Sequence, residues 1–236
     1  MDIVGDIMIK LAHRGYSDKY PENTMLAFKK AIERNFDGIE TDVHLTKDNY
    51  LVLIHDEKIN RTSNGKGYIK DLTYQELCNY NFNYHFKEYN VKIPLLEELL
   101  DYCIDKDIIL NLEIKTDKIH YQDIEKKVYE MVKKKGMLKQ VMFSSFCLDS
   151  LLKLREIDST LYLGYLFENN YLINKELVLK YKFNAAHPKY IFLNEQEIKD
   201  YNEANVDVNT WTVNDFEIMD FLVEAGVRTI ITNRDI

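Results

Sequence analysis

Cysteine, proline and glycine are scarce in this chain of 236 residues, which has 3 Cys, 3 Pro and 8 Gly. Cys78, Cys103 and Cys147 stand far apart, without the paired spacing of a disulfide framework or a zinc knuckle. We therefore expect a reducing compartment. Because there is no stretch rich in proline, glycine or serine that could serve as a linker, we expect residues 1–236 to form a single domain.

Long apolar runs and an excess of basic residues are also missing. The apolar runs are only a few residues long, too short to cross a bilayer, and residues 1–6 show neither the basic leader nor the apolar stretch of a secretory signal. The chain has 31 Lys and Arg against 39 Asp and Glu, a formal net charge of -8. This charge repels nucleic acid, which argues against binding of DNA or RNA as the main function. We expect a cytoplasmic protein without a transmembrane segment.

Short apolar runs do recur, and amphipathic segments lie between most of them. This rhythm predicts eight strands with interleaved helices, which is typical of a TIM (β/α)8 barrel or a doubly wound sheet. The predicted strands are 8–12, 38–42, 108–114, 141–145, 161–166, 184–186, 208–211 and 229–232. The predicted helices are 23–34, 95–105, 123–135, 148–156, 175–180, 195–204 and 215–225.

A ninth strand-like run, 50–55, favours the barrel. Only about seven residues separate it from the strand 38–42, fewer than a parallel crossover needs, so it should return as a hairpin and leave eight parallel strands. Residues 57–93 then cap one side of the mouth, which makes 44–93 a hairpin and capping insertion after strand two.

The chain stops at Ile236, just after the eighth strand, so we expect the eighth helix to be short or absent. The flank beside strands eight and one would then be covered by the first residues, by a partner chain in a homo-oligomer, or by little.

Carboxylates follow one another at the carboxyl ends of the predicted strands. Glu40 and Asp42 are two residues apart on strand two, so they face the same way, and Glu113 ends strand three. Two carboxylates about 5 Å apart repel by roughly 3 kcal/mol at an effective dielectric constant of about 20. The three groups therefore require a cation or added protons. Oxygen ligands without a thiolate favour one hard divalent cation, Mg²⁺ or Ca²⁺.

Histidines and basic residues accompany these carboxylates. His13 and Arg14 end strand one, His55 ends the hairpin, and Lys115 follows Glu113 by two positions. Imidazoles exchange protons near neutral pH, and the two cations would bind an anion beside the metal. The set predicts a site for a phosphate ester.

An ordered series of motifs from about residue 12 to residue 233 resembles the glycerophosphodiester phosphodiesterases. Each motif is weak alone, but the ordered series is specific. The matching segments are His-Arg-Gly at 13–15, Pro-Glu-Asn-Thr at 21–24, Gly-Ile-Glu-Thr-Asp-Val at 38–43, Thr-Lys-Asp at 46–48, His-Asp at 55–56, Arg-Thr at 61–62, Ile-Pro-Leu-Leu-Glu-Glu at 93–98, Leu-Glu-Ile-Lys at 112–115, Trp-Thr-Val-Asn at 211–214 and Ile-Thr-Asn at 231–233.

The resemblance implies a TIM-barrel enzyme that hydrolyses glycerophosphodiesters, such as glycerophosphocholine and glycerophosphoethanolamine, to sn-glycerol 3-phosphate and an alcohol. It implies that Glu40, Asp42 and Glu113 hold the divalent metal and that His13 and His55 are the acid/base pair. It also implies that the glycerol 2-hydroxyl attacks phosphorus first, giving a cyclic phosphate that water then opens.

The same resemblance implies that Arg14 and Lys115 bind phosphate oxygens, with Trp211 as an apolar wall near the glycerol or the leaving group. Two alternatives stay open. One is a lysophospholipase D-type enzyme that acts on lysophospholipids, and the other is a non-catalytic anion-binding barrel. The presence of both histidines and all three carboxylates argues against the latter.

Two further predictions are structural. His44, just past the metal-binding strand, is expected on the exposed surface of the hairpin. Within the motif at 21–24, Asn23 or Thr24 should lie near the cap of the first helix.

Overall fold

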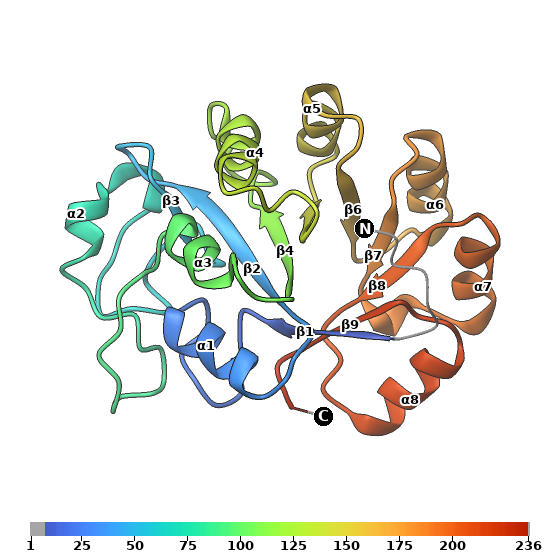
Figure 1. The fold of residues 1–236 in the computed structure, drawn as a ribbon, viewed down its shortest axis with the longest axis horizontal. Coiled ribbons are helices and arrows are strands. Elements are labelled where there is room, and N and C mark those ends of the chain that lie inside the picture. Colours follow the sequence, from blue (N-terminus) through green and yellow to red (C-terminus); the bar gives the residue numbers. More distant parts are fainter. Residues whose placement is uncertain (1–7, 236) are drawn as a thin grey trace.

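The computed structural model describes residues 8–235, in which eight parallel strands close into a barrel (Figure 1). The first strand pairs with the second on one side and with the last on the other, which closes the sheet. The predicted TIM barrel is confirmed, and the doubly wound sheet is excluded. The barrel strands are β1 (Ile9–His13), β2 (Gly38–Leu45), β4 (Ile109–Ile114), β5 (Val141–Ser145), β6 (Tyr162–Phe167), β7 (Ala185–Pro188), β8 (Asp207–Thr210) and β9 (Thr229–Thr232).

Helices alternate with these strands and form a ring around the barrel (Figure 1). Their apolar faces and the outward side chains of the strands form the main core, in which Phe28, Leu99, Phe143 and Leu163 are fully buried. The helices of the ring are α1 (Met25–Glu33), α3 (Leu96–Cys103), α4 (Ile124–Lys134), α5 (Leu148–Ile157), α6 (Tyr171–Lys180), α7 (Glu195–Glu203) and α8 (Phe216–Glu224).

The starts of helices α1 and α6 can be compared with the predictions. The hydroxyl of Thr24 accepts a hydrogen bond from the N–H of Ala27 and so caps α1. This agrees with the prediction that Asn23 or Thr24 lies near the cap. Helix α6 begins at Tyr171, one turn before the predicted start at 175. Leu172 and Ile173 are exposed in this first turn, so the turn lacks the apolar periodicity by which a helix is recognised.

The short strand β3 (Leu51–Leu53) pairs antiparallel with the far end of β2. The segment after it contains the 3-10 helix η1 (Ile69–Asp71) and the short helix α2 (Tyr74–Leu77). Side chains of this region form a small core of their own beside the barrel. Its buried members are Val52, Ile54, Ile59, Ile69, Leu77, Phe82 and Ile93.

The prediction that His44 lies on the exposed hairpin surface is wrong. Strand β2 continues to Leu45, and the His44 ring is fully buried. Its Nδ1 lies 2.8 Å from the Tyr121 hydroxyl and its Nε2 lies 3.1 Å from the carbonyl oxygen of His55. Burial lowers the pKa of His44 to about 4, so the ring is a neutral structural group near neutral pH.

Within residues 8–235, no helix follows β9, and none has both the length and the apolar composition needed to cross a bilayer. The first residues, 1–7, which were one candidate cover for the flank beside β9 and β1, lie outside the described residues.

A buried histidine lies in the interior of the barrel. His187 on β7 points inward, and its Nε2 lies 2.9 Å from Asn209 Nδ2 on β8. Gly164 on β6 makes room for the ring, because a Cβ there would lie 2.1 Å from Nε2 of His187. Burial lowers the pKa of His187 from its ordinary 6.5 to about 3.

This neutral histidine predicts a loss of stability in acid. The unfolded chain takes up the proton near pH 6.5 and the folded chain only near pH 3, so the contribution of His187 is complete above about pH 6.5 and is lost as the pH falls toward 3. In His187→Gln we expect the free energy of unfolding to fall less steeply between pH 6 and 4, by about 1.4 kcal/mol per pH unit. Urea denaturation at several pH values measures this slope.

The exposed His120 provides the matched control, since His120→Gln should leave the slope unchanged. Equal slopes in the parent and in His187→Gln would contradict the assignment, even if the variant is less stable at every pH.

Candidate active site

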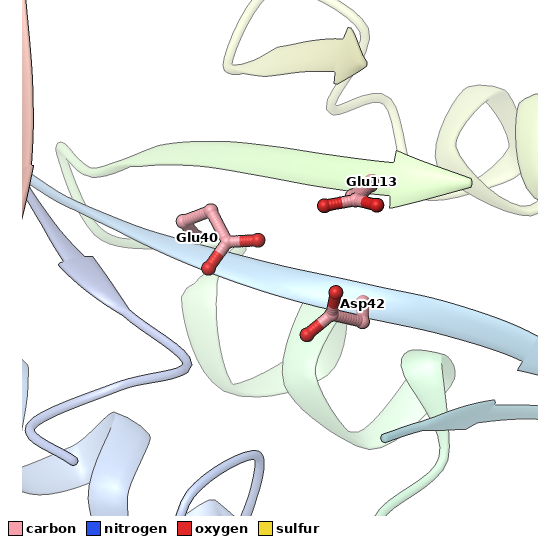
Figure 2. Close-up of side chains that lie close together, drawn as sticks. All are labelled: Glu40, Asp42 and Glu113. Atoms are coloured by element: carbon pink, nitrogen blue, oxygen red, sulfur yellow. The ribbon is translucent and has the colours of Figure 1, made fainter. Parts of the chain in front are cut away.

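Three carboxylates meet at the carboxyl end of the barrel, on β2 and β4. The parallel register pairs Asp42 with Glu113 and places Glu40 two residues before Asp42 on the same face. Figure 2 shows the three groups converging on one space between the two strands. One oxygen of each lies within 4.8 Å of the others, and all three side chains are buried.

Burial and mutual repulsion disturb the titration of this cluster. Burial, Asp42 and Glu113 together raise the pKa of Glu40 well above its usual range, and burial raises that of Glu113. Burial opposes ionisation of Asp42 too, but His55, Arg14 and Lys115 hold its pKa below the usual range. Three ionised carboxylates in this space are therefore costly without a cation.

The residues present fit a divalent cation. Buried carboxylate oxygens that repel one another and contact no thiolate are the ligands that Mg²⁺ and Ca²⁺ prefer. Part of the charge is already balanced, since Lys115 Nζ lies 2.7 Å from Glu113 Oε1 and 3.8 Å from Asp42 Oδ1. Arg14 Nε lies 3.6 Å from Asp42 Oδ2.

The two predicted histidines line the same cavity as Glu40 and Glu113. His13 pairs in register with Glu40, and its Nε2 lies 3.9 Å from Glu40 Oε2. Its Nδ1 lies 2.6 Å from Asn233 Oδ1, an oxygen that also accepts from the Ser17 hydroxyl. Asn233 therefore fixes the tautomer with the proton on Nδ1 and leaves Nε2 unprotonated. Burial and the nearby Arg14 lower the pKa of His13 to about 3.

A chain of ion pairs runs from the second histidine to Arg14. His55 Nδ1 lies 2.7 Å from Asp56 Oδ1, and Arg61 Nε donates to Asp56 Oδ2 at 2.8 Å. The guanidinium of Arg61 also donates to both oxygens of Glu22, which accepts from Arg14 Nη1 at 2.9 Å. Burial would raise the pKa of Glu22, but the hydrogen bonds and charges of Arg61 and Arg14 hold it below its usual range.

These groups line a cavity of about 300 Å³ at the barrel mouth. Seven of the eight predicted site residues line this cavity: His13, Arg14, Glu40, His55, Glu113, Lys115 and Trp211. The eighth, Asp42, lies behind Lys115 and Arg14. The Trp211 ring stands edge-to-face against Phe146, with centroids 5.7 Å apart, and together with Leu166 forms an apolar wall.

Three asparagines at the site had no predicted part in its chemistry. Asn23 donates to Asp42 Oδ2 at 2.9 Å and accepts from the Thr41 hydroxyl at 2.6 Å, so it orients a carboxylate of the cluster. Asn111 lines the cavity, and its Oδ1 has no hydrogen-bond partner among the described residues. The only sequence signal for Asn23 and Asn233 was their position within the motifs at 21–24 and 231–233. Asn111, two residues before Glu113, faces the same side of β4, which spacing could have indicated.

Comparisons with known proteins agree with this geometry. A family model described as the glycerophosphoryl diester phosphodiesterase family matches residues 13–235. A glycerophosphodiester phosphodiesterase from Caldanaerobacter subterraneus is 36% identical over 94% of this chain and 93% of its own length. The crystal structure of a glycerophosphodiester phosphodiesterase from Thermotoga maritima is 31% identical, has a TM-score of 0.79, and covers 97% of this chain and 96% of its own.

A third relative carries a bound molecule. A phosphodiesterase from Oleispira antarctica, solved in complex with the product sn-glycerol-3-phosphate, is 25% identical to this chain. The similarity has a TM-score of 0.90 and covers 95% of this chain and 92% of that one.

Proposed function

Because the chain belongs to the glycerophosphoryl diester phosphodiesterase family, we propose that its cavity hydrolyses glycerophosphodiesters such as glycerophosphocholine and glycerophosphoethanolamine. The products are sn-glycerol 3-phosphate and the free alcohol. The observation that carries this proposal is the convergence of three buried carboxylates and two histidines on one cavity at the carboxyl end of the barrel.

Glu40, Asp42 and Glu113 would hold one divalent cation, Mg²⁺ or Ca²⁺. When bound, the cation supplies positive charge that stabilises the negative charge developing on the phosphate oxygens. Asn23 supports this arrangement by holding Asp42 in place through its amide N–H.

His13 and His55 move the protons. His13 is neutral with Nε2 unprotonated, so it can accept the proton of the attacking hydroxyl. His55 donates Nδ1–H to Asp56, which orients the ring for proton exchange through its other nitrogen. We place the glycerol 2-hydroxyl as the first nucleophile, with the head-group alcohol leaving and a cyclic phosphate formed. Water then opens the ring with the same two histidines in reversed roles.

Arg14 and Lys115 bind the phosphate oxygens. Arg14 Nε is buried and has no hydrogen-bond partner among the described residues, so it has a donor available for an anion. Lys115 reaches the cavity from behind Glu113. Trp211, with Phe146, packs against the carbon atoms of the glycerol.

The segment 44–93 belongs to the same catalytic unit in this proposal, and residues 1–236 act as one domain. The support is that Arg61, within that segment, joins Asp56 to Glu22 and so links the insertion to the barrel loop after β1. We also place the protein in the cytoplasm, where thiols stay reduced, and the support is that its three cysteines are free. The non-catalytic barrel finds no support, because none of the catalytic groups is missing or displaced.

A product assay tests the proposal. We expect glycerophosphocholine to give sn-glycerol 3-phosphate and choline in equal amounts. The conversion of the phosphodiester to the phosphomonoester would be monitored by ³¹P NMR. The analogue methylated on the glycerol 2-oxygen should bind but not react, since it lacks the attacking hydroxyl. Hydrolysis of the methylated analogue at the parent rate would contradict the cyclic-phosphate route, and no hydrolysis of any glycerophosphodiester with Mg²⁺ or Ca²⁺ present would contradict the function.

A further inference from the structure

One buried side chain in the wall of the cavity has an oxygen atom that the protein leaves without a hydrogen bond. Asn111 is 1% exposed, and it lines the cavity. Its Oδ1 has no hydrogen-bond partner among residues 8–235. Buried polar atoms in native proteins are nearly always paired, because an unpaired one has lost its water without a replacement. The partner of Asn111 should therefore come from what the cavity binds.

The strand register places Asn111 beside the catalytic groups. His13 on β1 pairs with Glu40 on β2, and Glu40 pairs with Asn111 on β4. These three residues therefore lie at one level of the barrel. Glu113 is two residues nearer the mouth, on the face that Asn111 shares. Figure 2 shows that Glu40 and Glu113, the neighbours of Asn111 across and along the strands, point into one space.

The chemistry of the wall indicates what Asn111 can bind. Among the described residues that line the cavity, Asn111 is the only one with a side-chain amide, and none has an aliphatic hydroxyl. The charged groups of the wall suit a phosphate or a cation. An amide oxygen accepts a hydrogen bond from a hydroxyl without adding charge. The part of a substrate that fits Asn111 is therefore a neutral alcohol.

The proposed mechanism restricts how the glycerol can lie. Its 2-hydroxyl must reach Nε2 of His13 to lose its proton, and its phosphate must lie between Arg14 and Lys115. Lys115 follows Asn111 by four positions and is nearer the mouth, so the phosphate lies above the level of Asn111. The end of the glycerol that carries the 1-hydroxyl is then left to face the deeper wall.

The spacing of the strands suits the size of glycerol. Neighbouring strands lie about 4.8 Å apart, so the backbones of His13 and Asn111, on either side of β2, are about 10 Å apart. Both side chains point inward across this gap. A three-carbon alcohol between them can present its 2-hydroxyl to His13 and its 1-hydroxyl to Asn111.

We propose that Oδ1 of Asn111 accepts a hydrogen bond from the 1-hydroxyl of the glycerol, which makes Asn111 a specificity-determining residue for glycerol. This inference rests on the proposed function. The hydroxyl supplies the donor that the described part of the chain does not. A substrate without it would leave Oδ1 unpaired in the complex, and sites built to hydrogen-bond a hydroxyl discriminate against analogues that lack it.

Two substrates that differ only in this hydroxyl test the inference. We would compare glycerophosphocholine with its 1-deoxy analogue, 2-hydroxypropyl phosphocholine, which keeps the 2-hydroxyl, the phosphate and the head group. We expect kcat/KM of the parent to be about 10–100-fold lower for the analogue, because the buried acceptor is left unpaired. Most of the difference should lie in KM, since the hydroxyl is bound both before and during the reaction.

A variant and a matched control locate the effect. Asn111→Leu keeps a side chain of similar size that cannot form a hydrogen bond, so the two substrates should react with about equal kcat/KM. Asn209 is a second buried asparagine whose Oδ1 has no partner among the described residues, but it does not line the cavity. Asn209→Leu should therefore keep the parental preference. Asn111→Ala serves in the same comparison if Asn111→Leu does not fold.

Product binding gives a measurement that needs no turnover. By calorimetry in the presence of Mg²⁺, the parent should bind sn-glycerol 3-phosphate about 10–100-fold more tightly than 2-hydroxypropyl phosphate. Asn111→Leu should bind the two phosphates about equally. A variant that has lost hydrolysis can therefore still be compared with the parent.

The outcomes separate the inference from the function on which it rests. If the parent treats both substrates alike, or if Asn111→Leu keeps the parental preference, the inference is wrong and the function stands. If Asn111→Leu removes the rise in melting temperature that Mg²⁺ causes in the parent, Asn111 is a ligand of the cation and the inference is again wrong. If the parent hydrolyses no glycerophosphodiester, the proposed function fails and the inference fails with it.

Discussion

Replacing His13 with alanine is expected to lower kcat for glycerophosphocholine by about 10²–10⁴, the usual contribution of a positioned acid or base. His13 is the group with an unprotonated Nε2 at the cavity, held by Asn233 on its other nitrogen. KM should change little, because the phosphate is bound by Arg14 and Lys115. Initial rates under saturating substrate measure the effect.

His55→Ala should show a loss of the same order, because the second step needs the same pair in reversed roles. Removing both rings should cost little more than removing one, since groups that act as a unit are not additive. His120→Ala, in the exposed loop after β4, is the matched control and should keep the parental rate. Either single variant retaining activity within tenfold of the parent, with an unchanged melting temperature, would refute its role in proton transfer.

Removing divalent cations with a chelator is expected to abolish hydrolysis, and Mg²⁺ or Ca²⁺ should restore it. The same ions should raise the melting temperature without any substrate, because a cation relieves the repulsion among Glu40, Asp42 and Glu113. A ligand present at 100 times its Kd adds about 2.7 kcal/mol to the free energy of unfolding, or about 5–10 °C for a domain of this size.

Asp42→Asn preserves the size of the side chain but removes a charge from the centre of the cluster. In this variant we expect no ion-dependent rise in melting temperature and no hydrolysis. Glu130→Gln, an exposed carboxylate on α4, is the matched control and should keep both responses. A parent that hydrolyses substrate after exhaustive chelation, and melts at the same temperature with and without added ion, would show that the carboxylates do not hold a catalytic cation.

Much of the architecture could be predicted from local sequence. Parallel strands buried on both sides appear as short apolar runs, and the short gap between the strand 38–42 and the run 50–55 allows only a hairpin. The convergence of the three carboxylates could also be predicted from the strand pattern. Charged residues two positions apart in an otherwise apolar strand share one face, and the carboxyl ends of barrel strands meet at one mouth.

Residues that act through distant partners could not be predicted in this way. Asn233 is 220 positions from His13, and only the closure of β9 on β1 brings the two together. The burial of His44 depends on Tyr121, which is 77 positions away. Hairpin residues are usually solvated, and no local pattern showed that this hairpin would be covered.

The bond between Asn233 and His13 also bears on how the protein is made. Translation releases β1 and the three carboxylates well before Asn233, which orients the imidazole of His13. Until then this imidazole is free to rotate and to shift its proton. Hydrolysis should thus begin only after β9 has docked beside β1, and a chain still lacking β9 cannot act on the phosphodiesters around it.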